Sequence, residues 1–142
     1  MIRVVVDTTT LVSAIGWKDS KPRMILDRCV NGELHLLQSP ESFSELKEVL
    51  ERKKFSFIDS LLREEFLALL DALAVWVIPK TPIELCRDKD DNKFLSLAVD
   101  GGADCIISSD NGLLSVGNVN NIAIINPDAF LTKFPHEPNK KL

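Results

Sequence analysis

Five short, mainly apolar runs are spaced along the chain, and each is brief and lacks a clean alternation of apolar and polar positions. They lie at residues 2–6, 34–37, 75–78, 104–107 and 122–125. Continuous runs of this kind are typical of strands that are covered on both faces in a parallel sheet. The pattern therefore predicts a central, mostly parallel sheet of about five strands.

Helical patterns separate these runs. A helix is expected at 22–30, and a stronger one at 40–53, where Ser39 is the N-cap and Pro40 stands at the first helical position. The clearest helix is predicted at 58–73, because its apolar residues recur at helical spacing. These residues are Ile58, Leu61, Leu62, Phe66, Leu69, Leu70 and Leu73. Alternating strands and helices predict a doubly wound α/β fold, in which ligands bind at the carboxyl ends of the strands.

The composition, with 142 residues that are 45% hydrophobic and 27% charged, describes one soluble domain. We expect this domain at residues 1–133, followed at 134–142 by a loosely ordered tail that contains several prolines and lysines. No apolar run approaches the roughly 20 residues that span a bilayer, and the first residues lack the features of a signal peptide. These observations predict a cytoplasmic protein with no membrane partner.

The cysteines and the net charge exclude some classes of protein. Cys29, Cys86 and Cys105 are widely spaced and form no Cys-x-x-Cys pair, which argues against a disulfide framework or a zinc knuckle and favours buried thiols. The net charge of −4 argues against a protein that coats nucleic acid through bulk electrostatics. It is compatible with a nuclease, because carboxylates gathered around a metal make such an enzyme acidic.

Four acidic residues occupy positions that the predicted fold would bring to one edge of the sheet. Asp7 follows the first strand, and Asp110 closely follows the fourth. Glu45 lies one step from the apolar stripe of its helix, and Asp91 opens a later helix on its inward face. Carboxylates that converge repel one another unless a cation neutralises them. Oxygen ligands without nearby His or Cys favour Mg²⁺ or Mn²⁺, and such a site suits phosphodiester hydrolysis by a metal-activated water.

Each of these acids also has a more ordinary explanation. Asp7 can start an Asx turn, and Glu45 can be a solvated helix residue. Asp91 can be favoured by the dipole at a helix start. Asp110 can head a turn, because the Asn-Gly pair that follows it is also a hairpin signal. The order of the four acids along the strands and helices is what favours a shared site.

Four stretches of the chain carry a resemblance to a known family. They read VVVDTTTLVSA, SPESFSELKEVL, CRDKDDNKFLSLAVDGGADCIISSDNGLL and INPDAFL. In order and spacing they resemble the PIN-domain nucleases, specifically the small bacterial and archaeal toxins of toxin–antitoxin pairs. The family's Asp-Thr-Asn acid falls on Asp7, its helix glutamate on Glu45 and its helix-start acid on Asp91. Its Ser/Thr-x-Asp element falls on Ser108 and Asp110.

The resemblance implies a three-layer α/β/α sandwich and a ribonuclease that cleaves RNA with Mg²⁺ or Mn²⁺. The metal ligands and catalytic residues would be Asp7, Glu45, Asp91 and Asp110. It also implies a homodimer and an antitoxin protein that holds the nuclease inactive. Thr9 stands where the family usually has Asn, and a change beside metal ligands commonly costs about 10- to 100-fold in metal affinity or activity. Ser108 and Asp88 are candidates for positioning the ligands, whereas Asp104 is expected to be structural.

Basic and aromatic residues offer contacts to RNA. Candidates for phosphate contact are Lys18, Lys21, Arg23 and the run Arg52-Lys53-Lys54. For the run at 52–54 a solvated helix end is the favoured interpretation, because cations are favoured at helix C-termini. Trp17 is placed in a loop, where it can stack on a base or pack in an interface, whereas Trp76 is expected in the core.

Two other functions remain open. A binding module of the same fold, with turnover weakened by Thr9, would hold RNA or a protein partner. A receiver-like or phosphatase-like domain with Asp7 as phosphoryl acceptor would need a lysine after a late strand. No lysine follows Ile107 or Ile125 until Lys133, which makes this last class the weakest of the three.

Overall fold

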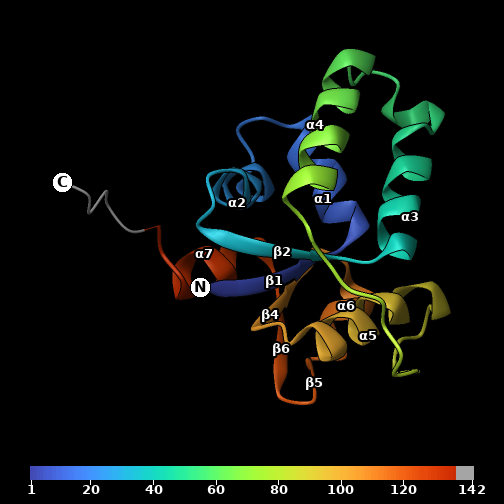
Figure 1. Ribbon diagram of the computed structural model, residues 1–142, viewed down its shortest axis with the longest axis vertical. Helices are drawn as coiled ribbons and strands as arrows, with labels where there is room; N and C mark the ends of the chain where they lie inside the picture. The colour runs from blue at the N-terminus through green and yellow to red at the C-terminus, as the bar shows by residue number, and fades with distance from the viewer. Residues whose placement is uncertain (137–142) are drawn as a thin grey trace.

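The computed structural model describes residues 1–136, which form one six-stranded sheet with helices on both faces (Figure 1). The strands are β1 (Ile2–Val6), β2 (Leu34–Gln38), β3 (Val75–Trp76), β4 (Cys105–Ile107), β5 (Asn118–Val119) and β6 (Ile122–Ile125). Their order in the sheet is β3-β2-β1-β4-β6-β5, and every neighbouring pair is parallel except β5 with β6. Because β1 and β4 are central neighbours, the residues that follow them emerge at the same edge.

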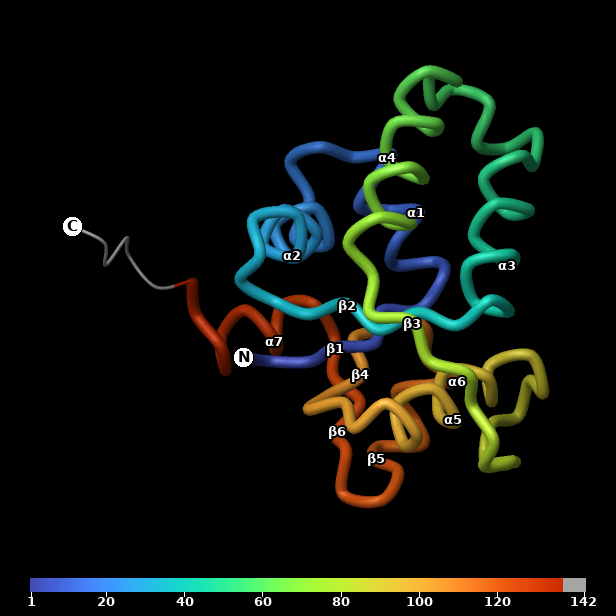
Figure 2. The backbone as a smooth tube through the Cα atoms, viewed as in Figure 1, coloured from blue at the N-terminus to red at the C-terminus, as the bar shows by residue number. Residues whose placement is uncertain are grey.

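Helices on the two faces make three layers (Figure 1). One face carries α1 (Thr8–Gly16), α2 (Lys21–Val30), α3 (Pro40–Leu50), α4 (Ser60–Leu73) and α7 (Pro127–Lys133). The other face carries α5 (Asn92–Gly101) and α6 (Asn111–Leu114). Two 3-10 turns, η1 (Lys53–Phe55) and η2 (Lys89–Asp91), precede α4 and α5. Figure 2 shows the chain between β3 and η2 running beside α5, where the Leu85 and Cys86 amides donate to Asn92 Oδ1.

The strands of the sheet are hydrophobic on both faces because both faces are buried. Val4 and Val6 of β1 pack in the cluster under α1 to α4, whereas Val5 packs in the cluster under α5 and α6. Leu36 and Leu37 of β2 divide between the two clusters in the same way. This division explains why the strands read as continuous apolar runs instead of an alternation.

Polar residues at the ends of strands start the helices that follow. Asp7 caps α1, and Ser39 caps α3 in a capping box with Ser42, ahead of a proline at the first helical position. At the other end of α5, Gly102 adopts a left-handed conformation with φ of 65°, which glycine accepts without a steric penalty. Strand ends and helix starts therefore coincide at the edge of the sheet where the acids lie.

The predicted three-layer α/β fold with a mostly parallel sheet is confirmed, and several local predictions are wrong. The helix expected at 40–53 ends at Leu50 and gives way to η1. The hairpin considered as an alternative at Asn111-Gly112 does not form, because this pair starts α6. Trp76 is 41% exposed instead of buried, because β3 is an edge strand of two residues, and its ring packs edge-on against Phe43.

Three further expectations concern the thiols, the membrane and the tail. Cys29 and Cys105 are buried and Cys86 is half-buried, and all three thiols are free. Within residues 1–136, no helix has the length and apolar character that crossing a membrane requires. Of the tail expected at 134–142, residues 137–142 lie outside the described part, and the Phe134 ring lies 5.0 Å from that of Phe130. The boundary at residue 133 stays a prediction.

Candidate active site

Asp7 directly follows β1 and is the N-cap of α1, so its carboxylate lies at the carboxyl edge of the sheet. Oδ1 accepts a hydrogen bond from the Thr10 amide (3.1 Å), which caps α1, and Oδ2 accepts one from Ser108 Oγ (2.6 Å). Ser108 is fully buried after β4, and its hydroxyl oxygen also accepts from the Asp110 amide (2.9 Å). Asp7 therefore has an ordinary structural role, as the N-cap of α1 and not as the start of an Asx turn, and the same carboxylate is tied to the segment that follows the neighbouring strand.

The carboxylates of Asp110 and Asp91 come from two different segments and both lie close to Gly112. Asp110 caps α6, and its Oδ2 accepts from the Leu113 amide (3.1 Å). Asp91 ends η2 at the start of α5, and its side chain makes no capping hydrogen bond. A β-carbon at Gly112 would stand 2.9 Å from Asp110 Oδ2 and 3.8 Å from Asp91 Oδ2. The two carboxylates therefore face the same small volume, which the glycine leaves open.

Glu45 reaches toward this region from the middle of α3, and both of its oxygens have partners. Thr8 Oγ1 donates a hydrogen bond to Oε1, and Lys93 Nζ lies 2.8 Å from Oε2. The Lys93 side chain is only 8% exposed, and its ammonium also donates to the Asp90 carbonyl (2.7 Å). Glu45 is thus held in a largely buried ion pair and is not a solvated helix residue.

The four carboxylates line one cavity, which also includes the side chains of Thr9 and Asp88. The structure therefore brings together the four predicted ligands from β1, α3, η2 and the start of α6. As the side chains stand, no three His, Cys, Asp or Glu residues within 1–136 are grouped closely enough to hold a metal ion. Glu45 instead faces Thr8 and Lys93. The donors are carboxylate oxygens, which suit a hard divalent cation.

Burial and the repulsion of neighbouring charges raise the pKa of two of these carboxyl groups, those of Asp91 and Asp7. Burial, followed by the negative charges of Asp110 and Asp88, raises the pKa of Asp91 to about 6. Burial also raises the pKa of Asp7, although the hydrogen bond from Ser108 opposes this shift. A cation in the cavity would relieve both effects, because it favours the ionised form of each neighbouring carboxyl group.

The remaining predicted site residues take different positions. Thr9 is exposed and lines the cavity next to Asp7. Asp88 lies on the rim, where Oδ1 accepts from the Asp90 amide (3.0 Å). Asp104 does not line this cavity, and its Oδ2 accepts from the Arg3 amide (2.8 Å). The structural role expected for Asp104 is consistent with that contact.

The two predicted basic patches also differ in their surroundings. Arg23 donates to the carbonyls of Ala14 and Ile15 at the end of α1, and Lys21 forms an ion pair with Asp128. Arg23 therefore ties α2 to the end of α1, and Lys21 is engaged in an exposed pair with α7. Arg52 and Lys54, together with Phe55, line the acidic cavity itself. The run at 52–54 is thus the basic patch that borders the site.

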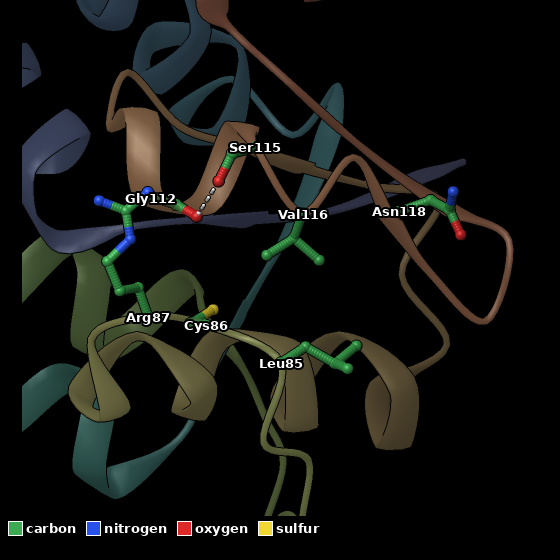
Figure 3. A pocket seen from close by; sticks show the side chains of 7 residues that line it. All are labelled: Leu85, Cys86, Arg87, Gly112, Ser115, Val116 and Asn118. Atoms are coloured by element: carbon green, nitrogen blue, oxygen red, sulfur yellow. Dashed lines mark hydrogen bonds between the residues drawn. The ribbon is translucent and has the colours of Figure 1, made fainter.

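A second cavity adjoins the acidic site at Gly112 (Figure 3). It is lined by Leu85, Cys86, Arg87, Gly112, Ser115, Val116 and Asn118. In Figure 3 the Arg87 side chain extends toward Gly112, and Ser115 Oγ donates to the Gly112 carbonyl (3.0 Å). One cation, Arg87, therefore lies on the Gly112 side of the acidic site, and Arg52 and Lys54 line the acidic cavity itself.

Sequence reasoning missed three residues of the site. Thr8 bonds Glu45, and Thr10 Oγ1 accepts from the Ser109 amide (3.1 Å), so the two threonines link the start of α1 to α3 and to the segment after β4. The three consecutive threonines after an acid were a usable signal. The sequence carried no such signal for Lys93, because a lysine next to the inward-facing Phe94 is interpreted as a surface residue unless its partner is known.

Comparison with known proteins agrees with this geometry. The family model for the PIN domain matches residues 3–112. The uncharacterized protein MJ1680 of Methanocaldococcus jannaschii is 31% identical over 127 residues, which cover 88% of this chain and 81% of that protein. The chain is also similar to two solved structures at low identity, which indicates a shared fold.

The first is VapBC2 from Rickettsia felis bound to a DNA fragment from its promoter, with a TM-score of 0.59 at 13% identity over 88% of this chain and 98% of that one. The second is FitAB bound to an IR36 DNA fragment, with a TM-score of 0.56 at 12% identity over 97% of this chain and 99% of that one. The matched segment 3–112 spans most of the chain and contains all four carboxylates of the cavity. This chain belongs to the PIN domain family.

Proposed function

We propose that this protein is an endoribonuclease that requires Mg²⁺ or Mn²⁺ and acts as the toxin of a toxin–antitoxin pair. The observation that carries the proposal is the single cavity lined by Asp7, Glu45, Asp91 and Asp110, which are contributed by four separate segments. Membership of the PIN domain family supports the nuclease assignment. VapBC and FitAB, which share the fold, are toxin–antitoxin complexes, and this supports an antitoxin partner.

The side chains present fit a hard divalent cation. The raised pKa values of Asp91 and Asp7 are those expected of carboxylates whose natural counter-ion is a cation. A bound Mg²⁺ or Mn²⁺ would lower the pKa of a water molecule and stabilise the charge that develops on the phosphate. Glu45 would join the ligands by exchanging its contact with Lys93 for the ion.

The residues of the chain hold the ligands and guide the substrate. Ser108 and the Thr10 amide fix the Asp7 carboxylate from two directions. Thr8 orients Glu45 in the same way. Arg52 at the rim offers a positive charge to the phosphate backbone of RNA. The homodimer implied by the resemblance stays a prediction.

The test is cleavage of a labelled RNA of mixed sequence by the purified protein in Mn²⁺, Mg²⁺ or EDTA. We expect cleavage that needs the metal and is abolished by Asp7→Asn, whose side-chain oxygen still caps α1. The matched control is Asp104→Asn, an exposed acid that does not line the cavity, which should cleave like the wild type. Cleavage that survives Asp7→Asn, or that persists in EDTA, would refute the proposed site.

A binding module of the same fold is the second candidate. Two observations favour it: Thr9 stands at the edge of the cavity where the family usually has Asn, and Lys93 occupies one oxygen of Glu45. Such a module would bind RNA without cutting it under any of the three conditions. Titration with RNA in EDTA separates this candidate from a protein with no affinity for RNA.

A further inference from the structure

Three aromatic rings run in contact from the acidic cavity to the far end of α1. Phe55 lines the cavity, and its ring centroid lies 6.5 Å from that of Phe57. Phe57 in turn lies 5.2 Å from Trp17, the residue that follows α1. Phe57 is 58% exposed and Trp17 is 50% exposed, although burying such rings would be strongly favourable. The three rings therefore form a continuous apolar strip, of which Phe57 and Trp17 are exposed and Phe55, beside the cavity, is partly buried.

Positive charges border this strip on the same segment of chain. Arg52, Lys53 and Lys54 immediately precede Phe55, and all three are exposed. The ammonium of Lys54 lies 5.1 Å from the centre of the Phe55 ring. Arg52 and Lys54 also line the acidic cavity, so the strip and the cavity form one continuous surface. Aromatic faces beside cations are the combination that binds single-stranded nucleic acid, through base stacking and phosphate contacts.

The backbone under these rings is well anchored. The Trp17 amide donates to the Ser13 carbonyl, and the Trp17 carbonyl accepts from both the amide and the hydroxyl of Ser20. The amide of Phe55 donates to the Arg52 carbonyl, and its carbonyl accepts from the Ile58 amide. The rings are therefore presented on ordered turns, which reduces the entropy lost when a base stacks on them.

We propose that Trp17, Phe57 and Phe55, with the cations at 52–54, form an aromatic track that holds single-stranded RNA and leads it into the acidic cavity. The proposal rests on the proposed function, because it identifies the class of RNA that the site accepts. Bases would stack on the outer faces of the rings, since the rings already touch each other. RNA is favoured over a protein partner because the cations stand within the aromatic segment and the strip runs into a cavity suited to phosphate chemistry.

The first experiment uses tryptophan fluorescence, since Trp17 and Trp76 are the two tryptophans of the chain. Trp76→Phe leaves Trp17 as the sole emitter. The probe is a single-stranded RNA of about 12 nucleotides, a length within the usual range of single-strand sites, added in EDTA so that no cleavage occurs. We expect saturating RNA to quench Trp17. The same sequence annealed as a duplex should quench it far less, because its bases are already stacked.

The second experiment measures affinity for the same RNA by anisotropy. Trp17→Leu should weaken binding by about 5- to 150-fold, the range expected when one aromatic ring that stacks on a base is removed. The matched control Trp76→Leu, at an exposed tryptophan on the edge strand, should bind like the wild type. Replacing Lys53 and Lys54 together by Gln should lower the slope of log affinity against log salt by about 1.4, at about 0.7 for each RNA phosphate that the protein no longer neutralises.

Several outcomes would overturn the aromatic track. These are an unchanged Trp17 emission at saturation, equal RNA affinity of Trp17→Leu and wild type, and no measurable RNA binding at all. If Trp17→Leu instead changes the oligomeric state in light scattering and leaves RNA affinity unchanged, the strip is a protein interface. Cleavage is not read in either experiment. A failure of the track therefore leaves the nuclease assignment standing, and a protein that binds through Trp17 but never cleaves RNA contradicts the nuclease alone.

Discussion

Lys93 makes the sharpest prediction, because it is the buried cation among the acids of the site. Its ammonium lies 2.8 Å from Glu45 Oε2 and donates to the Asp90 carbonyl, and its side chain is 8% exposed. We expect Lys93→Met to destabilise the metal-free protein and to strengthen its binding of divalent cations. Methionine keeps the length and the apolar stem of lysine, so the packing against Phe94 is retained.

The magnitude follows from the burial of the pair. Removing one partner of a buried ion pair costs about 3–5 kcal/mol, because the other charge is left without compensation. Glu45 keeps 26% exposure and its bond to Thr8, so the lower end of that range, about 3 kcal/mol, applies. For a chain of this length, each kcal/mol shifts Tm by about 3 °C, which gives a fall of roughly 9 °C. Loss of the hydrogen bond from Lys93 to the Asp90 carbonyl adds little to this cost, because Asp90 is exposed.

The assay is urea unfolding followed by circular dichroism, first in EDTA and then in Mn²⁺. A double-mutant cycle with Glu45→Gln isolates the coupling between the two side chains. In Mn²⁺ we expect a larger rise in stability for Lys93→Met than for the wild type, because the ion no longer competes with the ammonium for Oε2. A loss of less than about 0.5 kcal/mol in EDTA would place this pair among weak surface salt bridges and refute the reasoning.

Three further predictions test the rest of the site. In the folded protein the pKa of Asp91 is raised to about 6. The protonated carboxyl group therefore stabilises the folded state, and this stabilisation is complete below about pH 4 and is lost as the pH rises through about 6. In EDTA, Asp91→Asn should therefore gain stability relative to the wild type between about pH 5 and pH 7.5, and parallel urea midpoints would contradict this. Ser108→Ala should lower the free energy of unfolding by about 1–3 kcal/mol, because the buried Oδ2 of Asp7 and the Asp110 amide each lose the partner that Ser108 supplies; a change within about 0.5 kcal/mol would show that these groups find others. Thr9→Asn should tighten Mn²⁺ binding about 10- to 100-fold in calorimetry, and equal affinities would dismiss the threonine as a cause of weak metal binding.

The architecture was predictable from the chain because burial on both faces makes the strands continuous and leaves helical periodicity between them. The predictions that were wrong concern local features. β5 was missed because its two residues, next to the turn at Asn120 and Asn121, are too short for any period to be visible. Trp76 was placed in the core because it lies in a predicted strand, although position at the edge of a sheet depends on strand order, which no single segment encodes.

The candidate site shows the same limit. The acids could be chosen because strand ends and helix starts place them at one edge in any doubly wound sheet. The position of Lys93 could not, because its contact with Glu45 joins residues 48 positions apart on two different helices. Partners that meet only through tertiary packing leave no periodic signal in the sequence.

The ordinary and the chemical explanations of the acids are compatible, and this decides which substitutions are informative. Asp7 and Asp110 cap α1 and α6, and a cap fixes the direction of a carboxylate while leaving its charge available. Asp91 makes no capping hydrogen bond, whereas Glu45 is held by Thr8 and Lys93 and would have to leave Lys93 to bind an ion. Asparagine at position 7 can still accept from the Thr10 amide, whereas alanine cannot. Loss of cleavage in Asp7→Asn with an unchanged urea midpoint would therefore be assigned to the missing charge, whereas the same loss in Asp7→Ala would confound catalysis with the start of α1.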